Sequence, residues 1–265
     1  MSRRDNTLTE VLANRRWLRC ADPFPYIVVR DVFTKSFYRE LEGSFQEVLS
    51  RGFGHPGERG RFVRSVPEHK MPGYDAHILV LNSGISGPLT IFISRQWRDM
   101  LASVASQHAT CDVQCALHHH PVGSANGWVH TDLGLKWFID DPQPDGVNLA
   151  CTGRTPTGAR QAGGKARPVV RSLAMLFYLN NKWAPGSGGE TGLYLSAHDP
   201  PSKPARLVPP INNSLLLFEC TPYSFHTFLQ NRHYERNSVN LWLHRPKNEV
   251  VARWGESRIF DVERV

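Results

Sequence analysis

The stretch FHTFLQNRHYERNSVNLWLH, residues 225–244, decides how this chain is interpreted. It places His226 ten residues before Arg236, and a run of alternating polar and apolar residues follows. One side of that run carries Ser238, Asn240 and Trp242, and the other carries Val239, Leu241 and Leu243. Because successive side chains of a strand point to opposite faces, the pattern predicts a strand with one apolar face and one face that bears an arginine and a hydroxyl.

A second polar pair occurs earlier, in GWVHTDLG, residues 127–134. His130 and Asp132 are two positions apart, so on an extended chain their side chains share a face and can bind one ion. An antiparallel neighbour could bring His226 beside them. Two imidazoles and one carboxylate leave coordination positions open, which is the ligand set of non-haem Fe(II) oxygenases. The sequence therefore predicts a metal site at His130, Asp132 and His226.

Arg236 and Ser238 need a partner if their face of the strand lines a cavity. A buried guanidinium without a counter-charge is strongly destabilising, and its planar fork matches a carboxylate. A keto acid with two carboxylates, bound to iron at one end and to Arg236 at the other, meets both requirements. We expect Asn240, next on the same face, to contact this cosubstrate as well.

Length and composition are those of a folded protein with a sizeable core. The chain has 265 residues, of which 40% are hydrophobic and 21% charged, with a net charge of +7. Its arginines are scattered and form no stripe interleaved with aromatic residues, so we expect no nucleic-acid partner. No apolar run is long enough to cross a bilayer and no secretory signal is present, so we expect no membrane association. The five cysteines lack CxxC spacing, which favours a reducing, cytoplasmic location.

The order of patterns predicts one domain, residues 1–265, with three parts. Residues 1–109 contain two amphipathic helical patterns and a strand, and we interpret them as a supporting layer. Residues 110–247 contain short apolar runs separated by turn residues, as in a β-barrel or sandwich. Residues 140–171 interrupt this region without periodicity and are predicted to be a structureless flap, and residues 248–265 a tail.

The sequence resembles the iron- and 2-oxoglutarate-dependent dioxygenases, and within them the prolyl-hydroxylase-like branch. The resemblance covers approximately residues 110–245 and depends on HHPVGSANGWVHTD (119–132), FYLNNKWAPGSGGETGLYL (177–195) and the stretch 225–244. It implies a mainly β fold with flanking helices, a double-stranded β-helix (jelly-roll, cupin-like barrel) buttressed by N-terminal helices. It also implies Fe(II), 2-oxoglutarate and O2 as cofactor and cosubstrates.

Carried over to this chain, the resemblance makes His130, Asp132 and His226 the iron ligands and Arg236 the partner of the distal carboxylate of 2-oxoglutarate. Ser238 completes an arginine-x-serine pattern, and Tyr178 matches a tyrosine that donates to the same carboxylate. His120 stands where relatives carry a tyrosine near the cosubstrate, so we expect it to donate to or pack beside 2-oxoglutarate. Asp132 is retained where halogenating relatives have a small residue, which favours hydroxylation.

Three functions remain open from the sequence. The first is a hydroxylase that acts on an unactivated C–H of a small molecule, an amino acid or a natural-product intermediate, and releases succinate and CO2. The second is a protein hydroxylase of prolyl type, and the third is a non-catalytic cupin-like barrel that binds or senses a metal. Trp137, Trp242 and Glu190 are candidate substrate contacts.

Overall fold

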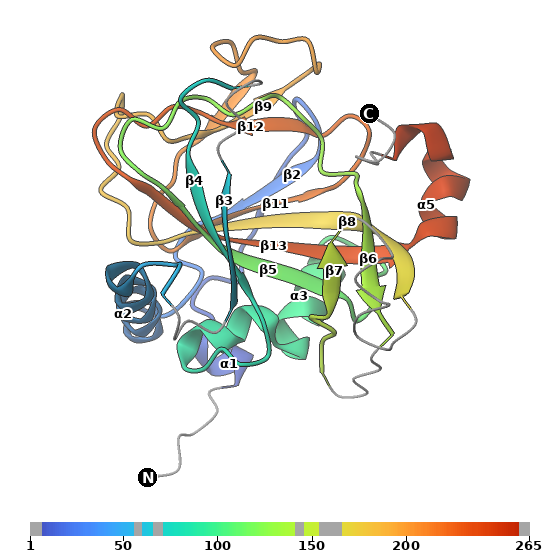
Figure 1. The fold of residues 1–265 in the computed structure, drawn as a ribbon, viewed down its shortest axis with the longest axis horizontal. Coiled ribbons are helices and arrows are strands. Elements are labelled where there is room, and N and C mark those ends of the chain that lie inside the picture. Colours follow the sequence, from blue (N-terminus) through green and yellow to red (C-terminus); the bar gives the residue numbers. More distant parts are fainter. Residues whose placement is uncertain (1–6, 56–59, 66–70, 141–145, 154–165, 260–265) are drawn as a thin grey trace.

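The structure, a computed structural model, describes residues 7–55, 60–65, 71–140, 146–153 and 166–259. Two antiparallel sheets form the framework of the described part of the chain (Figure 1). The main sheet runs in the order β1 (Leu18–Cys20), β2 (Tyr26–Val29), β11 (Ser214–Glu219), β8 (Ala166–Tyr178), β13 (Arg236–Pro246), β5 (Val113–His120), β4 (Ala76–Leu81) and β3 (Gly60–Ser65), and β6 (Leu135–Ile139) pairs with β8 and with β7 (Cys151–Gly153). The small sheet runs β10 (Arg206–Val208), β9 (Thr191–Tyr194) and β12 (Phe225–Phe228). The predicted mainly β fold is confirmed.

The alternation within 236–244 separates two cores, as predicted. Val239, Leu241 and Leu243 of β13 join an apolar cluster on the outer face of the main sheet, which also contains residues of the N-terminal helices. Tyr178 and Leu176 of β8 belong to a second cluster that includes Leu193 of the small sheet. This inner cluster lies between the two sheets, and the polar face of β13 points toward it.

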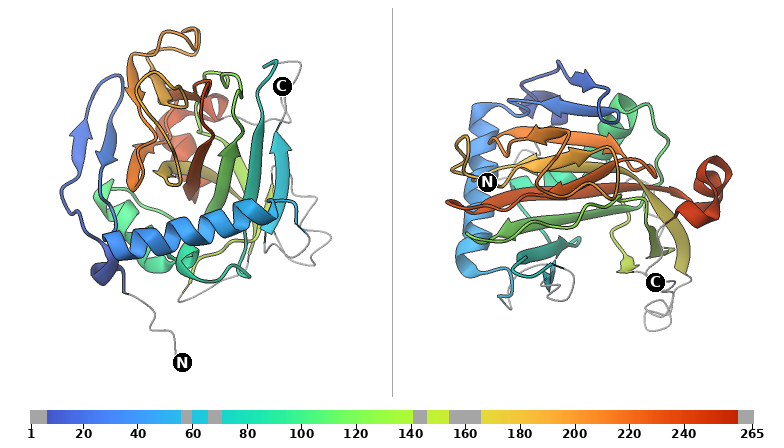
Figure 2. Two further views of the ribbon diagram at one scale, coloured as in Figure 1. Left: turned by 90° about the vertical axis from the view of Figure 1, so that its left-hand side faces the viewer. Right: turned by 90° about the horizontal axis from the view of Figure 1, so that it is seen from above.

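Helices cover the outer face of the main sheet. They are α1 (Leu8–Val11), α2 (Lys35–Arg51), the 3-10 helix η1 (Pro88–Ile93) and α3 (Arg95–Val104), and the C-terminal segment adds α5 (Lys247–Trp254) and the 3-10 helix η2 (Glu256–Arg258). The long helix α2 crosses the strands at the end of the molecule opposite α5 (Figures 1 and 2). Thr34 caps α2 by accepting a hydrogen bond from the backbone N–H of Phe37, as its position before an apolar helical pattern predicts. No helix in the described ranges is long and apolar enough to span a membrane.

Four expectations about local structure are wrong. The helical pattern from Pro88 is two helices, because the Ser94 hydroxyl accepts from Trp97 N–H and starts a new one. The stretch 51–75, rich in Gly, Pro and Arg and expected to be a loop, contains β3. The predicted flap 140–171 contains β7 and the first residues of β8, while its segments 141–145 and 154–165 lie outside the described residues. The presumed tail contains α5, which packs against β8 and β13.

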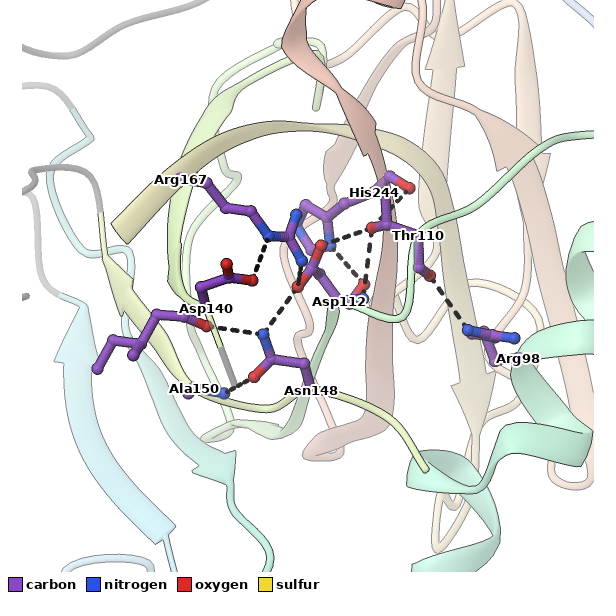
Figure 3. A network of polar contacts seen from close by, with 9 residues as sticks. Arg98, Thr110, Asp112, Asp140, Asn148, Ala150, Arg167 and His244 are labelled. Carbon is purple, nitrogen blue, oxygen red and sulfur yellow. Dashed lines mark hydrogen bonds and ion pairs between the residues drawn. The ribbon is translucent and has the colours of Figure 1, made fainter. Parts of the chain in front are cut away.

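A buried aspartate fastens the described part of the segment after β6 to the end of β13 (Figure 3). Asp112 is fully buried, and its carboxylate accepts hydrogen bonds from Thr110, from the amide of Asn148 at 2.9 Å and from the guanidinium of Arg167 at 2.6 Å. Its carbonyl accepts from Nδ1 of His244 at 2.9 Å. Two residues of the supposed flap, Asn148 and Arg167, thus meet at one carboxylate, which explains why the described part of this segment is regular.

Candidate metal and cosubstrate site

The two candidate metal histidines are neighbours because their backbones pair. His226 lies in β12, and His130 lies before β6 in the chain. The two residues form an isolated antiparallel bridge. The two residues exchange both backbone hydrogen bonds, at 3.1 and 2.9 Å. Their rings lie 4.5 Å apart between centroids. Directly opposed residues in such a pair project side chains to the same face, so the pairing brings both imidazoles to one point.

The orientation of each imidazole leaves one nitrogen available. Nδ1 of His130 lies 2.8 Å from the carbonyl oxygen of Trp128, and Nδ1 of His226 lies 3.0 Å from that of Ser224. A carbonyl only accepts, so each Nδ1 carries the proton and donates, and each Nε2 keeps its lone pair. Metal-binding histidines are commonly oriented in this way. Burial, and then the neighbouring His226, lowers the pKa of His130 to about 4, which keeps the ring neutral and able to bind a cation.

Asp132 completes the group. One ligand atom from each of His130, Asp132 and His226 lies within 4.8 Å of the others, and Nε2 of His226 is 3.5 Å from Oδ2 of Asp132. Burial would raise the pKa of Asp132, but the guanidinium of Arg171, and then the two histidines, hold it well below its usual range. Two imidazoles and one carboxylate that leave further positions open are the donor set of non-haem Fe(II) enzymes. The residues present therefore fit this metal.

Two donors fix the carboxylate. Nη1 of Arg171 donates to Oδ1 of Asp132 at 2.9 Å, and Nε1 of Trp242 donates to Oδ2 at 2.7 Å. The guanidinium of Arg171 also lies over the Trp242 ring, 4.0 Å from its centroid. Partners of this kind orient metal ligands. The sequence predicted this role for neither residue, and Trp242 was expected to contact the substrate.

A buried cationic pocket forms at the Arg236 end of the barrel interior. Arg236 is 3% exposed, and burial lowers its pKa. Its Nη1 donates to Ser238 at 3.0 Å and its Nη2 to Thr191 at 3.3 Å, while its buried Nε has no hydrogen-bond partner within the described chain. The hydroxyl of Tyr178 is 2.8 Å from that of Thr191. No carboxylate of the described chain pairs with this guanidinium, so the pocket suits an external anion such as the distal carboxylate of 2-oxoglutarate.

His120 lies in this pocket with its donor already used. Its Nδ1 is 3.1 Å from the carbonyl oxygen of Asp75, and its ring stacks on Phe228 with centroids 3.9 Å apart. Burial, and then Arg236, holds its pKa well below the usual range, so the ring is neutral and its free nitrogen is an acceptor. The expectation that His120 packs beside the cosubstrate agrees with this geometry better than donation does.

Tyr74 and Thr191 are the pocket residues that sequence reasoning missed. The ring centroid of Tyr74 lies 5.5 Å from that of His120 and 6.2 Å from that of Phe228. Burial raises the pKa of Tyr74 to about 12, although the charge of Arg236 acts in the opposite direction. Tyr74 comes from the segment before β4, far from any motif. Thr191 directly follows Glu190, and the alternation of β9 offered the only signal for it.

The remaining substrate candidates have structural partners. Glu190 accepts a hydrogen bond from Nε1 of Trp183 at 3.2 Å. Trp137 lies in β6, where it packs against the inner apolar cluster. Asn240, by contrast, lies on the inner face as predicted and accepts from Ser238 at 2.7 Å.

Comparisons with known proteins agree with this geometry. Residues 163–244 match the family model of the 2OG-Fe(II) oxygenase superfamily. Among solved structures the fold is similar to a prolyl-4-hydroxylase of Pseudomonas putida, with 17% identity, a TM-score of 0.55, and coverage of 83% of this chain and 92% of that one. It is also similar to a prolyl hydroxylase of Trichoplax adhaerens solved with a hypoxia inducible factor peptide fragment, with 16% identity, a TM-score of 0.50 and 86% coverage of both chains. No curated protein matches by sequence.

The matched segment contains Tyr178, His226 and Arg236, and members of this superfamily use Fe(II), 2-oxoglutarate and O2. The predicted fold, enzyme class and cofactors are confirmed. Residues 163–244 belong to the 2OG-Fe(II) oxygenase superfamily, and the chain that carries them is an oxygenase enzyme with the fold of its prolyl-4-hydroxylase-like members.

Proposed function

We propose that this oxygenase hydroxylates an unactivated C–H of a small molecule, an amino acid or a natural-product intermediate, with release of succinate and CO2. The observation that carries the reaction class is the pairing of His130 with His226 around Asp132, together with the unpartnered Nε of Arg236. We assign His130, Asp132 and His226 to the metal, and Arg236, Ser238 and Tyr178 to the distal carboxylate of 2-oxoglutarate. When bound, Fe(II) would activate O2, the oxidant, while the keto acid would act as the two-electron reductant and be converted to succinate and CO2.

The chain's own groups orient the reactants and exclude water. The Nδ1 hydrogen bonds of both histidines fix their rings, and Arg171 and Trp242 fix the carboxylate of Asp132. At the other end, Arg236, Ser238 and Thr191 are almost fully buried, so a keto acid bound there is shielded from solvent. Such preorganisation determines which C–H faces the oxidant.

A compact substrate is supported by the half-buried polar side chains inside the barrel. Gln114, His118 and Arg171 are partly accessible and lie on the inner face of the main sheet beside Asp132.

Five free cysteines support the further proposal of a cytoplasmic location.

A protein substrate is the second candidate. Trp128 is 43% exposed, and its ring lies 5.2 Å from that of the metal-binding candidate His130. An exposed tryptophan beside an active site suits contact with a polypeptide. The Trichoplax relative was solved with a peptide fragment, although its likeness to this chain concerns the fold alone.

The test is succinate release with Fe(II) and 2-oxoglutarate, screened against small molecules and peptides. We expect His130→Ala and Asp132→Ala to abolish turnover, and Arg236→Ala to raise the 2-oxoglutarate requirement while metal binding is largely retained. Equal use of 2-oxoglutarate by the Arg236 variant and the parent would contradict the assigned role. Stimulation by peptides alone would favour the protein hydroxylase, and metal binding without 2-oxoglutarate binding would favour the sensing barrel.

A further inference from the structure

Three unused side chains share the inner face of β5 and β13 beside Asp132. Gln114 lies directly opposite Trp242, Ala116 opposite Asn240, and His118 opposite Ser238. Residues two apart on a strand are about 7 Å apart on the same face, and directly opposed residues are closer. Gln114, His118 and Asn240 therefore form one group around Ala116, on strands that lie side by side in Figure 1. We name this group the donor wall.

The hydrogen bonds of Gln114 leave its amide nitrogen free. Nη2 of Arg171 donates to its side-chain oxygen at 3.1 Å. An arginine can only donate, so the atom it contacts is the amide oxygen, and the NH2 group points elsewhere. That NH2 group has no partner in the portion of the chain that the structure describes.

The side-chain amide of Asn240 also has a free NH2 group, because two hydrogen bonds in series end at its oxygen. Arg236 donates to the hydroxyl of Ser238, which must then donate its own proton to Oδ1 of Asn240, at 2.7 Å. The NH2 group of Asn240 has no partner within the described ranges. Arg171 directly occupies the amide oxygen of Gln114, and Arg236 occupies that of Asn240 through the hydroxyl of Ser238. The NH2 groups of both amides remain free to donate.

His118 adds a third donor between these two amides. Its ring is partly accessible, lies 6.2 Å from that of Trp242, and makes no hydrogen bond to any residue that the structure describes. Burial, followed by Arg236 and Arg171, lowers the pKa of His118 to about 3, so the neutral ring offers one N–H. The charged groups that face it are Arg236, Arg171 and Asp132.

The charge balance of the loaded site favours an anion. Asp132 offsets one charge of Fe(II), and a 2-oxoglutarate dianion offsets the other charge together with that of Arg236. The charge of Arg171 then remains. Three donors without an acceptor, next to an excess positive charge, are the surroundings that a carboxylate requires.

We propose that the donor wall binds the carboxylate of a small-molecule substrate, with Arg171 supplying the positive charge and Gln114, His118 and Asn240 the hydrogen bonds. This inference rests on the proposed function and narrows its substrate to carboxylic acids such as free amino acids. An interior residue of a protein substrate carries no free α-carboxylate. The iron-binding carboxylate of 2-oxoglutarate has the same chemistry, so the test must separate the two sources.

Two variants remove the donors with little other change. In Gln114→Glu the oxygen that accepts from Arg171 is kept, but a carboxylate oxygen replaces the NH2 group and repels an anion. In His118→Phe the ring is kept and its N–H is lost, and His118→Gln restores a donor as the conservative variant. His198→Phe is the matched control, since His198 is exposed and its side chain makes no hydrogen bond or ion pair within the described chain.

Binding is measured by calorimetry without oxygen, on protein loaded with Fe(II) and 2-oxoglutarate. The probes are free amino acids and aliphatic and aromatic carboxylic acids, each compared with its own carboxamide. We expect at least one acid to bind while its amide does not, with affinity about 10- to 100-fold weaker in His118→Phe and in Gln114→Glu. His118→Gln should recover part of the loss, and His198→Phe should bind like the parent. Thermal unfolding of each variant shows whether it is folded.

The affinity for 2-oxoglutarate is measured in the same samples. A loss of 2-oxoglutarate affinity larger than the loss of acid affinity in these variants would assign the donor wall to the cosubstrate and overturn the proposal. The proposal would also be overturned if the parent protein bound each acid and its amide equally well. It would likewise be overturned if the parent bound 2-oxoglutarate but none of the acids. A parent that binds no 2-oxoglutarate would instead contradict the proposed function itself.

Discussion

The indole Nε1 of Trp242 donates a 2.7 Å hydrogen bond to Oδ2 of Asp132. Arg171 holds the other oxygen and lies over the same indole ring. The candidate metal carboxylate therefore has one partner on each oxygen, and the two partners contact one another. Both oxygens are fixed before any metal binds.

Replacing Trp242 by phenylalanine should weaken metal binding without unfolding the protein. The ring and its contact with Arg171 are retained, but Oδ2 loses its donor, and loss of a partner of a metal ligand typically lowers metal affinity about 10- to 100-fold. Calorimetric titration with Fe(II) without oxygen measures the effect. Trp254→Phe, on α5, is the control and should bind metal like the parent. Unchanged metal affinity in Trp242→Phe would show that this hydrogen bond does not orient Asp132.

Thr191→Val should weaken 2-oxoglutarate binding by about 5- to 10-fold, the ratio expected for one neutral hydrogen bond. The hydroxyl of Thr191 accepts from Arg236 and contacts that of Tyr178, so its loss removes a contact that positions both groups. Affinity is measured by titration of the Fe(II)-loaded protein without oxygen. Thr227→Val is the control, because Thr227 is equally buried but lies outside the pocket contacts described above. If both variants bind 2-oxoglutarate equally, Thr191 has no part in the pocket.

Asp112→Asn should destabilise the fold by about 2 to 3 kcal/mol. Breaking a fully buried ion pair costs about 3 to 5 kcal/mol, and the cost here is smaller because the side chain of Arg167 is 33% exposed. The free energy of unfolding in urea measures the loss. Asp99→Asn removes the ion pairs of the exposed Asp99 with Arg95 and Arg98 on α3 and should change stability by about 0 to 1 kcal/mol. An equally small effect at Asp112 would mean that the contacts in Figure 3 do not hold this segment.

Stability of the metal-free protein should fall as the pH is lowered from 6.5, partly because of His244. Burial lowers the pKa of His244 to about 3, from an ordinary value near 6.5. The unfolded chain then takes up the proton first, so the stabilisation is complete above pH 6.5 and is lost as the pH falls toward 3. Between pH 6.5 and 5 the loss amounts to about 2 kcal/mol.

His244→Asn isolates this contribution, because the asparagine amide can still donate to the carbonyl of Asp112. The difference in unfolding free energy between parent and variant should shrink as the pH falls. His198→Asn is the control, at a histidine that is exposed. Parallel pH curves for the parent and His244→Asn would show that His244 is protonated equally in both states.

Patterns within a few residues predicted much of the site. Alternation placed Arg236, Ser238 and Asn240 on one face of a strand, and two-residue spacing placed His130 beside Asp132, because strand geometry is local. Thr34 before an apolar helical pattern predicted α2 for the same reason.

Local spacing patterns could not predict contacts between segments that are distant in the sequence. Arg171 lies inside β8, and its role was not predicted because its partners Asp132 and Gln114 are far away in the sequence. Tyr74 reaches the pocket from a segment without periodicity. The strands β3 and β7 are edge strands with few apolar residues. Their extended conformation depends on pairing with neighbouring strands, so their own residues gave little signal.

The bridge between His130 and His226 consists of backbone hydrogen bonds. Both residues hold their ring nitrogens in place through carbonyl groups of their own segments, so a protein that has lost its iron keeps the geometry of the site. We therefore expect oxidised or chelated iron to be exchangeable: the emptied enzyme should regain full activity on addition of fresh ferrous ion within the time of mixing, without a refolding step.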